Sequence, residues 1–338
     1  MSIFFPTGVS LGNPCHKVVD VRTQPYYVST NILSKDVKMT GKLEGLVIPV
    51  MEPLGYPHGW AGEAAKRIQD AVPADCGQLV LNSTVITDVL TCGGLWQGKE
   101  VAMETPDHVF WLRRKLVHNI TMEYLEHAMV WGPQKPIEFV HEYLTTEVNF
   151  DPLTATWLFL QNEFERTELA NELAMAIAYL LEAWPQITDA SQVTFGPVLQ
   201  SLSVGGVLLE AKHIDVTFGD HRLGVEAMWP GAVLVRLVSG TPSPQELEEM
   251  QLGAVVHALV TGCPPQRLVV FGLGSGKGIG MDVEREWLEM GIGGVMAAVE
   301  AIADIRNDRG VVVAGGEHCV QCPFNDSCDV SEADDYPF

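Results

Sequence analysis

Residues 233–259 read VLVRLVSGTPSPQELEEMQLGAVVHAL, and this stretch decides the fold. The first six residues are apolar apart from one arginine, which is typical of a short buried strand. Ser243 followed by Pro244 is a common opening for a helix, and Gly262 is a common end. The stretch therefore predicts a strand that turns directly into an amphipathic helix.

The residues on both sides of this stretch extend the pattern. Before it, residues 198–220 suggest two strands that are joined around Gly205 and Gly206. After it, residues 266–276 form another apolar strand pattern, and residues 282–305 have the period of a long helix. Strands and helices in this order predict an α/β or α+β core with a mixed sheet, which we assign to residues 191–310.

Residues 106–190 have a different character. Residues 105–131, 135–148 and 154–184 each show helical periodicity, and Pro185 stops the last of them. We expect a helical region here, inserted before the core. The N-terminal segment, residues 1–105, is rich in Gly and Pro and is predicted to be strand-rich, with strands in residues 42–55 and 77–90 and a short helix in residues 59–72 between them.

The overall composition limits the classes of function. The chain has 338 residues, 47% of them hydrophobic and 19% charged, which is an ordinary globular balance. Its formal net charge of −22 disfavours a protein whose main task is to bind DNA alone, because the phosphate backbone is also negative. No apolar stretch approaches the ~20 residues that cross a bilayer, and no signal-peptide pattern is present, so we expect a cytoplasmic protein without a membrane partner.

Three of the seven cysteines lie within ten residues, in GGEHCVQCPFNDSC (315–328). The spacing of Cys319, Cys322 and Cys328 lets three thiolates converge on one centre, and thiolates select zinc or iron–sulfur clusters. This tail, residues 311–338, is therefore predicted to bind a [4Fe–4S] cluster, with zinc as the alternative. A closed site needs a fourth ligand. The candidates for this fourth ligand are Cys15, Cys76, Cys92, Cys263 and His318, of which we favour Cys15 and interpret Cys263 as structural.

Residues 205–328 resemble the RecB-type nucleases of the PD-(D/E)XK superfamily, including CRISPR-associated members with iron–sulfur clusters. The resemblance lies in LLEAKHIDVTFGD (208–220), in the strand–helix stretch that opens this section, and in the cysteine triplet. It implies a nuclease-like core in which Asp215 is the first acidic residue and Gln251 the motif glutamine. It also implies a fourth cysteine far upstream, near the N-terminus, and a helix histidine that assists the metal, for which His118 is the candidate.

The chain departs from that family at the residues that carry out hydrolysis. Where the family has Asp-x-Lys-Thr-Gly, this sequence has Arg236 at the acidic position and Val238 at the lysine position. Phosphodiester hydrolysis of this kind needs carboxylates that hold Mg²⁺ and a cation that stabilises the developing charge. An arginine in this place is expected to form a salt bridge with Asp215, and a valine cannot take part in proton transfer. The sequence thus predicts a degenerate catalytic motif.

Other acidic residues could replace the lost ones. Glu226 lies in a predicted loop and could reach the site. Glu210 and Lys212 each lie an odd number of residues before Asp215, so in one extended strand their side chains would point to the opposite face from that of Asp215. An active Mg²⁺- or Mn²⁺-dependent DNA exonuclease with rearranged acidic residues is therefore the alternative function.

Two further patterns have ordinary interpretations. The glycine-rich residues 272–280 lack the spacing of a phosphate-binding loop and are interpreted as a turn after a strand. The basic run in residues 111–118 is a local cationic patch that could contact nucleic acid, although such a run is more often a solvated helix face.

These observations lead to one prediction of function. We expect a catalytically inactive, nuclease-like iron–sulfur protein that serves as a structural or interaction subunit of a nucleic-acid-handling complex. Its partners would be other protein subunits, and nucleic acid would be reached through them or through the local basic patch.

Overall fold

The computed structural model describes the backbone of most of the chain. The described residues are 38–40, 59–74, 76–101, 109–146, 150–184, 193–196, 201–219, 232–307, 309–310, 313–324, 326 and 328. The predicted strand in residues 42–55 lies outside them.

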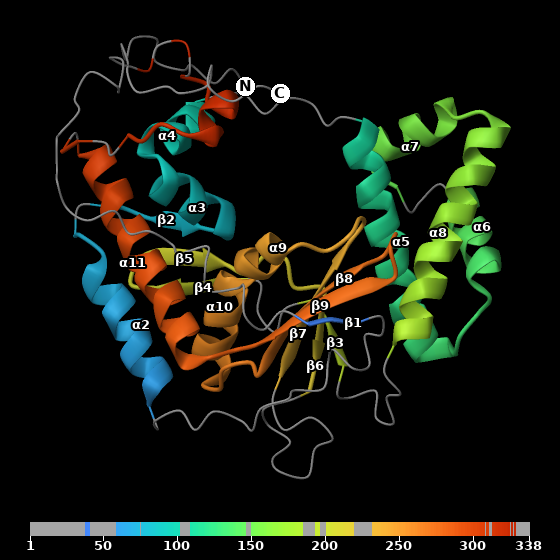
Figure 1. The fold of residues 1–338 in the computed structure, drawn as a ribbon, viewed down its shortest axis with the longest axis horizontal. Coiled ribbons are helices and arrows are strands. Elements are labelled where there is room, and N and C mark those ends of the chain that lie inside the picture. Colours follow the sequence, from blue (N-terminus) through green and yellow to red (C-terminus); the bar gives the residue numbers. More distant parts are fainter. Residues whose placement is uncertain are drawn as a thin grey trace, which may run out of the picture.

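A six-stranded mixed sheet forms the centre of the molecule (Figure 1), with the strand order β1-β9-β8-β7-β6-β3. Its strands are β1 (Lys38–Thr40), β3 (Val193–Phe195), β6 (Val216–Phe218), β7 (Val233–Val238), β8 (Arg267–Gly272) and β9 (Lys277–Asp282). Strands β7 and β8 are parallel, and the other neighbouring pairs are antiparallel. The expected mixed sheet is therefore confirmed.

The connection between β7 and β8 is helical, as parallel neighbours require. It consists of α9 (Pro244–Glu249) and α10 (Gln251–Thr261), which are separated at Met250, whereas the sequence predicted one continuous helix. Ser243 and Glu246 form a capping box at the start, and Gly262 ends α10 with a left-handed φ of 75°.

Each face of the sheet packs against a separate hydrophobic core. Leu234 on β7 belongs to the core shared with α10 and α11 (Arg285–Arg306), together with Leu268 and Ile279. Its neighbours Val233 and Val235 belong to the core shared with the helical region. Because successive side chains of a strand point to opposite faces, an apolar strand such as β7 must be buried on both sides. The result is a helix–sheet–helix arrangement.

The region that the sequence predicts to be helical contains four helices in the structure. They are α5 (Val109–Trp131), α6 (Pro136–Thr145), α7 (Pro152–Leu160) and α8 (Glu163–Ala183). Figure 1 shows them gathered on one side of the sheet, opposite α2, α10 and α11. The side chain of Asn162 caps α8, and Asp151 caps α7, so each helix begins at a residue whose side chain accepts the first free N–H groups.

In the described part of the N-terminal segment, the helix predicted in residues 59–72 is present, whereas most of the strand predicted in residues 77–90 is helical. Three helices lie here, α2 (Trp60–Ala71), α3 (Ser83–Thr91) and α4 (Gly93–Val101), with β2 (Leu79–Leu81) between the first two. The strand expected in residues 77–90 ends early because the side chain of Asn82 accepts a hydrogen bond from the Val85 N–H and so starts α3. Strand β2 pairs with the hairpin of β4 (Ser201–Val204) and β5 (Val207–Glu210) in a second, three-stranded sheet.

The glycine-rich residues after β8 form the predicted turn, but the turn is shorter than expected because β9 begins at Lys277. Gly274 approaches the backbone so closely that an added Cβ would lie 2.6 Å from the Ser239 carbonyl oxygen. The turn therefore packs against the residues that follow β7. Among the described residues, none of the helices combines the length and the apolar character needed to cross a bilayer.

Close packing between α10 and α11 gives a first prediction. A Cβ on Gly291 would lie 2.9 Å from both Gln251 Cγ and Val255 Cγ2, whereas one on Gly293 would meet nothing within 4 Å. We expect Gly291→Ala to lower the free energy of unfolding by about 1–3 kcal/mol through overpacking. Gly293→Ala is the matched control and should raise it by about 0.5–1 kcal/mol, because alanine favours the helix. Denaturant unfolding measures both changes, and equal effects would contradict the packing described.

Candidate functional site

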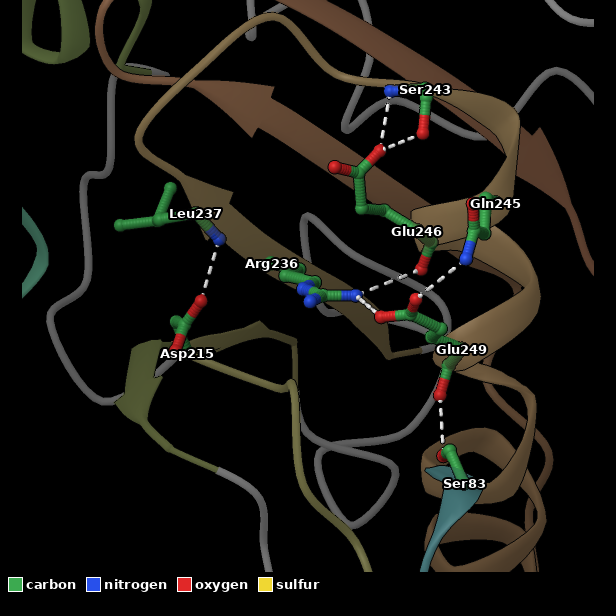
Figure 2. Close-up of polar contacts among 8 residues, drawn as sticks. All are labelled: Ser83, Asp215, Arg236, Leu237, Ser243, Gln245, Glu246 and Glu249. Carbon is green, nitrogen blue, oxygen red and sulfur yellow. Dashed lines mark hydrogen bonds and ion pairs between the residues drawn. The ribbon is translucent and has the colours of Figure 1, made fainter. Parts of the chain in front are cut away.

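Asp215 lies just before β6, at the centre of the candidate site. Its backbone N–H donates to the Val235 carbonyl at 2.8 Å, which fixes the residue beside β7. The carboxylate then accepts two further hydrogen bonds. Oδ2 accepts the backbone N–H of Leu237 at 2.6 Å (Figure 2), and Oδ1 lies 2.8 Å from His118 Nε2. Both carboxylate oxygens therefore have partners within the protein.

His118 reaches this carboxylate from α5. Burial lowers the pKa of His118, but the hydrogen bond to Asp215 and the negative charge of Asp215 together raise that pKa above its ordinary value. A protonated His118 and an ionised Asp215 thus form an ion pair that joins residues 97 positions apart in the sequence. The pair connects the helical region to the sheet. The family resemblance indicated His118 as a candidate, but the residue pattern alone gave no sign that it would meet Asp215.

Arg236 does not pair with Asp215, so the expectation of that salt bridge is wrong. Its Nη1 lies 2.6 Å from Glu249 Oε2 and also points to the Glu246 carbonyl at 3.5 Å (Figure 2). The two residues are brought together because α9 returns the chain over the middle of β7. Only 15% of the Arg236 side chain is exposed, so its charge depends on this partner.

The remaining motif positions have structural contacts. Val238 packs against the core that β7 shares with α10 and α11, and Val255 on α10 is fully buried in that core. Gln251 donates from Nε2 to the Trp287 carbonyl at 2.8 Å and so links α10 to α11. These residues hold helices together, and none of them supplies a charge.

The sequence predicted that Glu210 and Lys212 point to the opposite face of one strand that also carries Asp215. This is wrong, because β5 and β6 belong to different sheets. The chain turns between them at His213, whose φ of 70° is unusual for a residue other than glycine. Lys212 forms an ion pair with Glu210 at 3.0 Å. Burial and the nearby charge of Arg236 lower the pKa of His213. Glu226 lies outside the described residues.

This arrangement is poorly suited to holding a catalytic divalent cation. Mg²⁺ and Mn²⁺ need carboxylate oxygens that are available for coordination. Each oxygen of Asp215 already accepts one hydrogen bond, so a metal ion would have to share the carboxylate, and Glu249 is paired with Arg236. Within the part of the chain that the structure describes, no three His, Cys, Asp or Glu side chains are arranged to hold a metal ion.

The C-terminal cysteines form the second part of the candidate site. Cys319 is buried in a short 3₁₀ helix (Glu317–Gln321), and Cys322 and Cys328 are half-buried. Burial raises the pKa of the Cys322 thiol, and the nearby thiols of Cys92, Cys328 and Cys319 raise it further, although a backbone hydrogen bond from Phe324 opposes them. The cysteine triplet is therefore close to a fourth cysteine, which is Cys92.

Cys92 is buried at the junction between α3 and α4, and α4 packs against the tail. A Cβ on Gly98 would lie 3.1 Å from the side chains of Pro323 and Phe324, so a larger residue at this position on α4 would require the tail to shift slightly. Of the other candidates, Cys76 is buried in the hydrophobic core, and His318 Nε2 lies 3.9 Å from Cys319 Sγ. His318 Nε2 is 2.9 Å from the Ala314 carbonyl oxygen, and Cys263 is exposed after α10. The favoured ligand, Cys15, lies outside the described residues.

The four thiols of Cys92, Cys319, Cys322 and Cys328 are called the cysteine group below. A single zinc ion draws four sulfurs around one atom. Among the described residues no three His, Cys, Asp or Glu side chains are arranged to hold a metal ion, and this includes the cysteine group. A [4Fe–4S] cluster takes one thiolate on each of four separate irons, so its ligands surround a larger core. Partial burial of the thiols and the absence of carboxylates from this group also agree with thiolate-only ligation.

The basic run on α5 is largely paired. Arg113 forms an ion pair with Glu172 on α8, and its Nε donates to Glu172 Oε2 at 2.7 Å. Lys115 Nζ lies 3.4 Å from Asp151 Oδ2. These exposed pairs support the interpretation of the run as a solvated helix face.

Comparison with protein families finds no match for this chain, and comparison with curated proteins finds none that is significant. The site must therefore be interpreted from its own geometry.

The His118–Asp215 pair predicts a pH dependence of stability. Because folding raises the pKa of His118, the pair contributes fully below the unfolded-state pKa of about 6.5 and is lost as the pH rises through the folded-state pKa. His118→Gln should lower the free energy of unfolding by about 1 kcal/mol near pH 5.5 and by less near pH 8.5. Denaturant unfolding at the two pH values checks this. His141→Gln, an exposed change on α6, is the control, and a His118→Gln effect independent of pH would contradict the ion pair.

Proposed function

We propose that this chain is a nuclease-like iron–sulfur protein without hydrolytic activity, which serves as a structural or interaction subunit of a nucleic-acid-handling complex. The observation that carries the proposal is the pairing of Arg236 with Glu249 at the position where a nuclease of this type would hold its metal. The guanidinium is a permanent cation, so it competes with Mg²⁺ or Mn²⁺ for the same carboxylate.

The surroundings of Asp215 support the same conclusion. A metal ion would have to share the carboxylate with the Leu237 N–H and with His118, and both contacts also join separate elements of the fold. Val238 supplies no cation for the attacked phosphate. We infer that the former catalytic residues now stabilise the contact between the helical region and the sheet.

The cysteine group would hold the cluster in this proposal. We propose Cys92 as its fourth ligand in place of Cys15, because Cys92 is the cysteine whose thiol influences Cys322 from outside the triplet. The bound group supplies iron–thiolate bonds between α3–α4 and the tail. Such bonds close a long loop of the chain, which restricts the unfolded state strongly.

The acidic balance of the chain supports an assembly role. A net charge of −22 repels nucleic acid, and the basic run on α5 is paired with carboxylates. Contact with nucleic acid would therefore be made largely by partner subunits. A metal-dependent DNA exonuclease is the alternative, and one observation favours it: His118 and Asp215 still face each other in the site.

Cleavage assays separate these two functions. We expect purified protein with Mn²⁺ and labelled single- or double-stranded DNA to show no cleavage above background. Cleavage that Asp215→Ala abolishes would establish the exonuclease and overturn our proposal. An assay of Glu249→Gln tests in the same way whether a rearranged carboxylate takes part.

Restoring the missing residues tests whether the site retains a nuclease-like geometry. The double change Arg236→Glu and Val238→Lys supplies the acid and the cation that the motif lacks. We expect this variant to gain Mn²⁺-dependent DNA cleavage of at least about 10²-fold over the wild-type background, in line with the contribution of a positioned acid–base group. Adding Asp215→Ala should remove the gained activity, and Arg236→Glu alone should show little. A folded double variant without activity would count against the nuclease-like site.

The cysteine group gives a separate prediction. Protein purified without oxygen should be brown and contain about four iron and four sulfide ions per chain. Cys92→Ser should lose most of this iron and the visible absorption, because a buried ligand is removed. Cys263→Ser, at an exposed cysteine, is the matched control and should keep both. Full iron content in Cys92→Ser would exclude Cys92 as a ligand, and colourless protein with stoichiometric zinc would exclude the cluster.

A further inference from the structure

A cavity with a volume of about 340 Å³ lies where the start of α3, helix α4 and the turn between β5 and β6 meet, and we call it the α3 cavity. Its walls include Asn82, Thr84, Trp96, Lys99 and His213. The Ser83 hydroxyl at the start of α3 donates to the Glu249 backbone carbonyl at 2.7 Å, so the cavity lies beside the Arg236–Glu249 pair. Cavities of this size bind small molecules in other proteins. The α3 cavity is therefore a candidate ligand site next to the nuclease-like site.

His213 belongs to the cavity wall and has a strained backbone. Its φ of 70° is the only positive φ of a residue other than glycine in the part of the chain that the structure describes. Such conformations persist only where the surrounding structure imposes them, and they are concentrated at functional sites. Burial and the nearby charge of Arg236 lower the pKa of His213, so its ring is neutral at pH 7 and offers one donor and one acceptor. None of the described residues forms a hydrogen bond with this ring, which leaves both nitrogens for a ligand.

The Asp88–Lys99 pair supplies a second set of polar groups to the cavity. Lys99 Nζ lies 2.9 Å from each oxygen of Asp88. One of its three N–H donors remains, and each carboxylate oxygen keeps a second lone pair, so the pair presents a donor and an acceptor side by side. Asn82 adds two donors. Its amide oxygen caps α3 by accepting the Val85 N–H at 3.0 Å, and its NH₂ group has no partner among the described residues.

The charges that line the cavity are balanced. The cation of Lys99 is neutralised by Asp88, and that of Lys212 by Glu210, whose carboxylate lies 3.0 Å away. An anionic ligand would therefore gain little here, in contrast to a phosphate-binding pocket. The indole of Trp96 gives the wall an aromatic part. A ligand that fits this cavity is neutral, has a flat apolar face and carries hydrogen-bond donors and acceptors along its edge.

These are the properties of a nucleobase. Proteins recognise an unpaired base by hydrogen bonds to its Watson–Crick edge, where donors and acceptors are adjacent, and by packing of an aromatic side chain against its ring. We propose that the α3 cavity binds a single unpaired nucleobase. The Asp88–Lys99 pair and His213 contact its edge, and Trp96 packs against its ring.

Two sources offer this chemistry, a free nucleoside and a single-stranded nucleic acid. A strand is the source that the neighbouring nuclease-like site favours, and this choice alone rests on the proposed function. The net charge of −22 repels the phosphates of a strand, so we expect the chain by itself to bind a strand weakly. In the proposed complex, partner subunits would hold the strand and the α3 cavity would receive one of its bases.

Calorimetric titration of the full-length protein with adenosine, cytidine, guanosine and uridine tests the cavity. We expect saturable binding of at least one nucleoside and no binding of inorganic phosphate. His213→Gly should weaken binding of that nucleoside by at least about tenfold, because a hydrogen bond to the base is lost. The unfolding midpoint of this variant should not fall, because glycine adopts a positive φ without strain. A residue with a purely structural role would lower the midpoint instead.

A pair of threonines on α3 provides a matched control. Thr84 lines the cavity, whereas Thr87 is equally exposed on the same helix but lies outside the cavity. Thr84→Leu adds bulk at the rim and removes a hydroxyl, so it should weaken nucleoside binding by at least about tenfold. Thr87→Leu should leave nucleoside binding unchanged.

Competition with short DNA strands separates the two sources. A single-stranded oligonucleotide that displaces the nucleoside, where an abasic strand of the same length does not, identifies a strand base as the ligand. Nucleoside binding without such displacement identifies a free nucleoside in the same cavity. The proposal is overturned if no nucleoside binds, if inorganic phosphate binds as tightly, or if Thr84→Leu and His213→Gly leave binding intact. Failure of the proposed function is distinguishable from these results, because DNA cleavage or the lack of a cluster leaves nucleoside binding unaffected.

Discussion

The carboxylate of Asp215 is the contact on which the arrangement of this protein depends. It accepts the Leu237 N–H from β7 and pairs with His118 from α5, so one side chain joins the sheet to the helical region. A half-buried carboxylate is stable only when its oxygens have partners. Here the partners come from two elements far apart in the sequence. The same contacts that satisfy Asp215 also occupy the atoms that a metal ion would need.

Arg236 is likewise held by a contact between separate elements of the fold. Its position on β7 places a cation under α9, where Glu249 neutralises it, and the Ser83 hydroxyl donates to the Glu249 backbone carbonyl at 2.7 Å (Figure 2). A buried ion pair of this kind contributes little net stability, but removing one partner leaves an uncompensated charge. Because Arg236 occupies this position, Glu249 is needed to balance its charge. The pair therefore helps to hold α9 against β7.

Much of the sheet and its helices could be predicted from local patterns. Strand β7, the capped start of α9 and the left-handed end at Gly262 follow from residue types close together in the sequence. The site contacts could not be predicted in the same way. Arg236 was expected to meet Asp215 because the two are close in a linear motif, yet α9 brings Glu249 nearer. The predicted orientation of Glu210, which assumed one continuous strand up to Asp215, is wrong because a turn at His213 moves the chain from one sheet to another.

The identity of the fourth cysteine stays a prediction, because Cys15 lies outside the described residues and Cys92 is a proposal from the structure. Nothing in the local sequence distinguishes Cys92 from Cys15, since both are single cysteines far from the triplet. The difference arises from α3, which is held at one end by the contact of Ser83 with Glu249 and carries Cys92 at the other end. One short helix thus connects the Arg236–Glu249 pair to the cysteine group. Ligation of a cluster at Cys92 would fix the end of α3, and through Ser83 it would also restrain the backbone of Glu249. The two parts of the candidate site are therefore linked through α3, so in the proposed function a bound cluster would also restrain the Arg236–Glu249 pair.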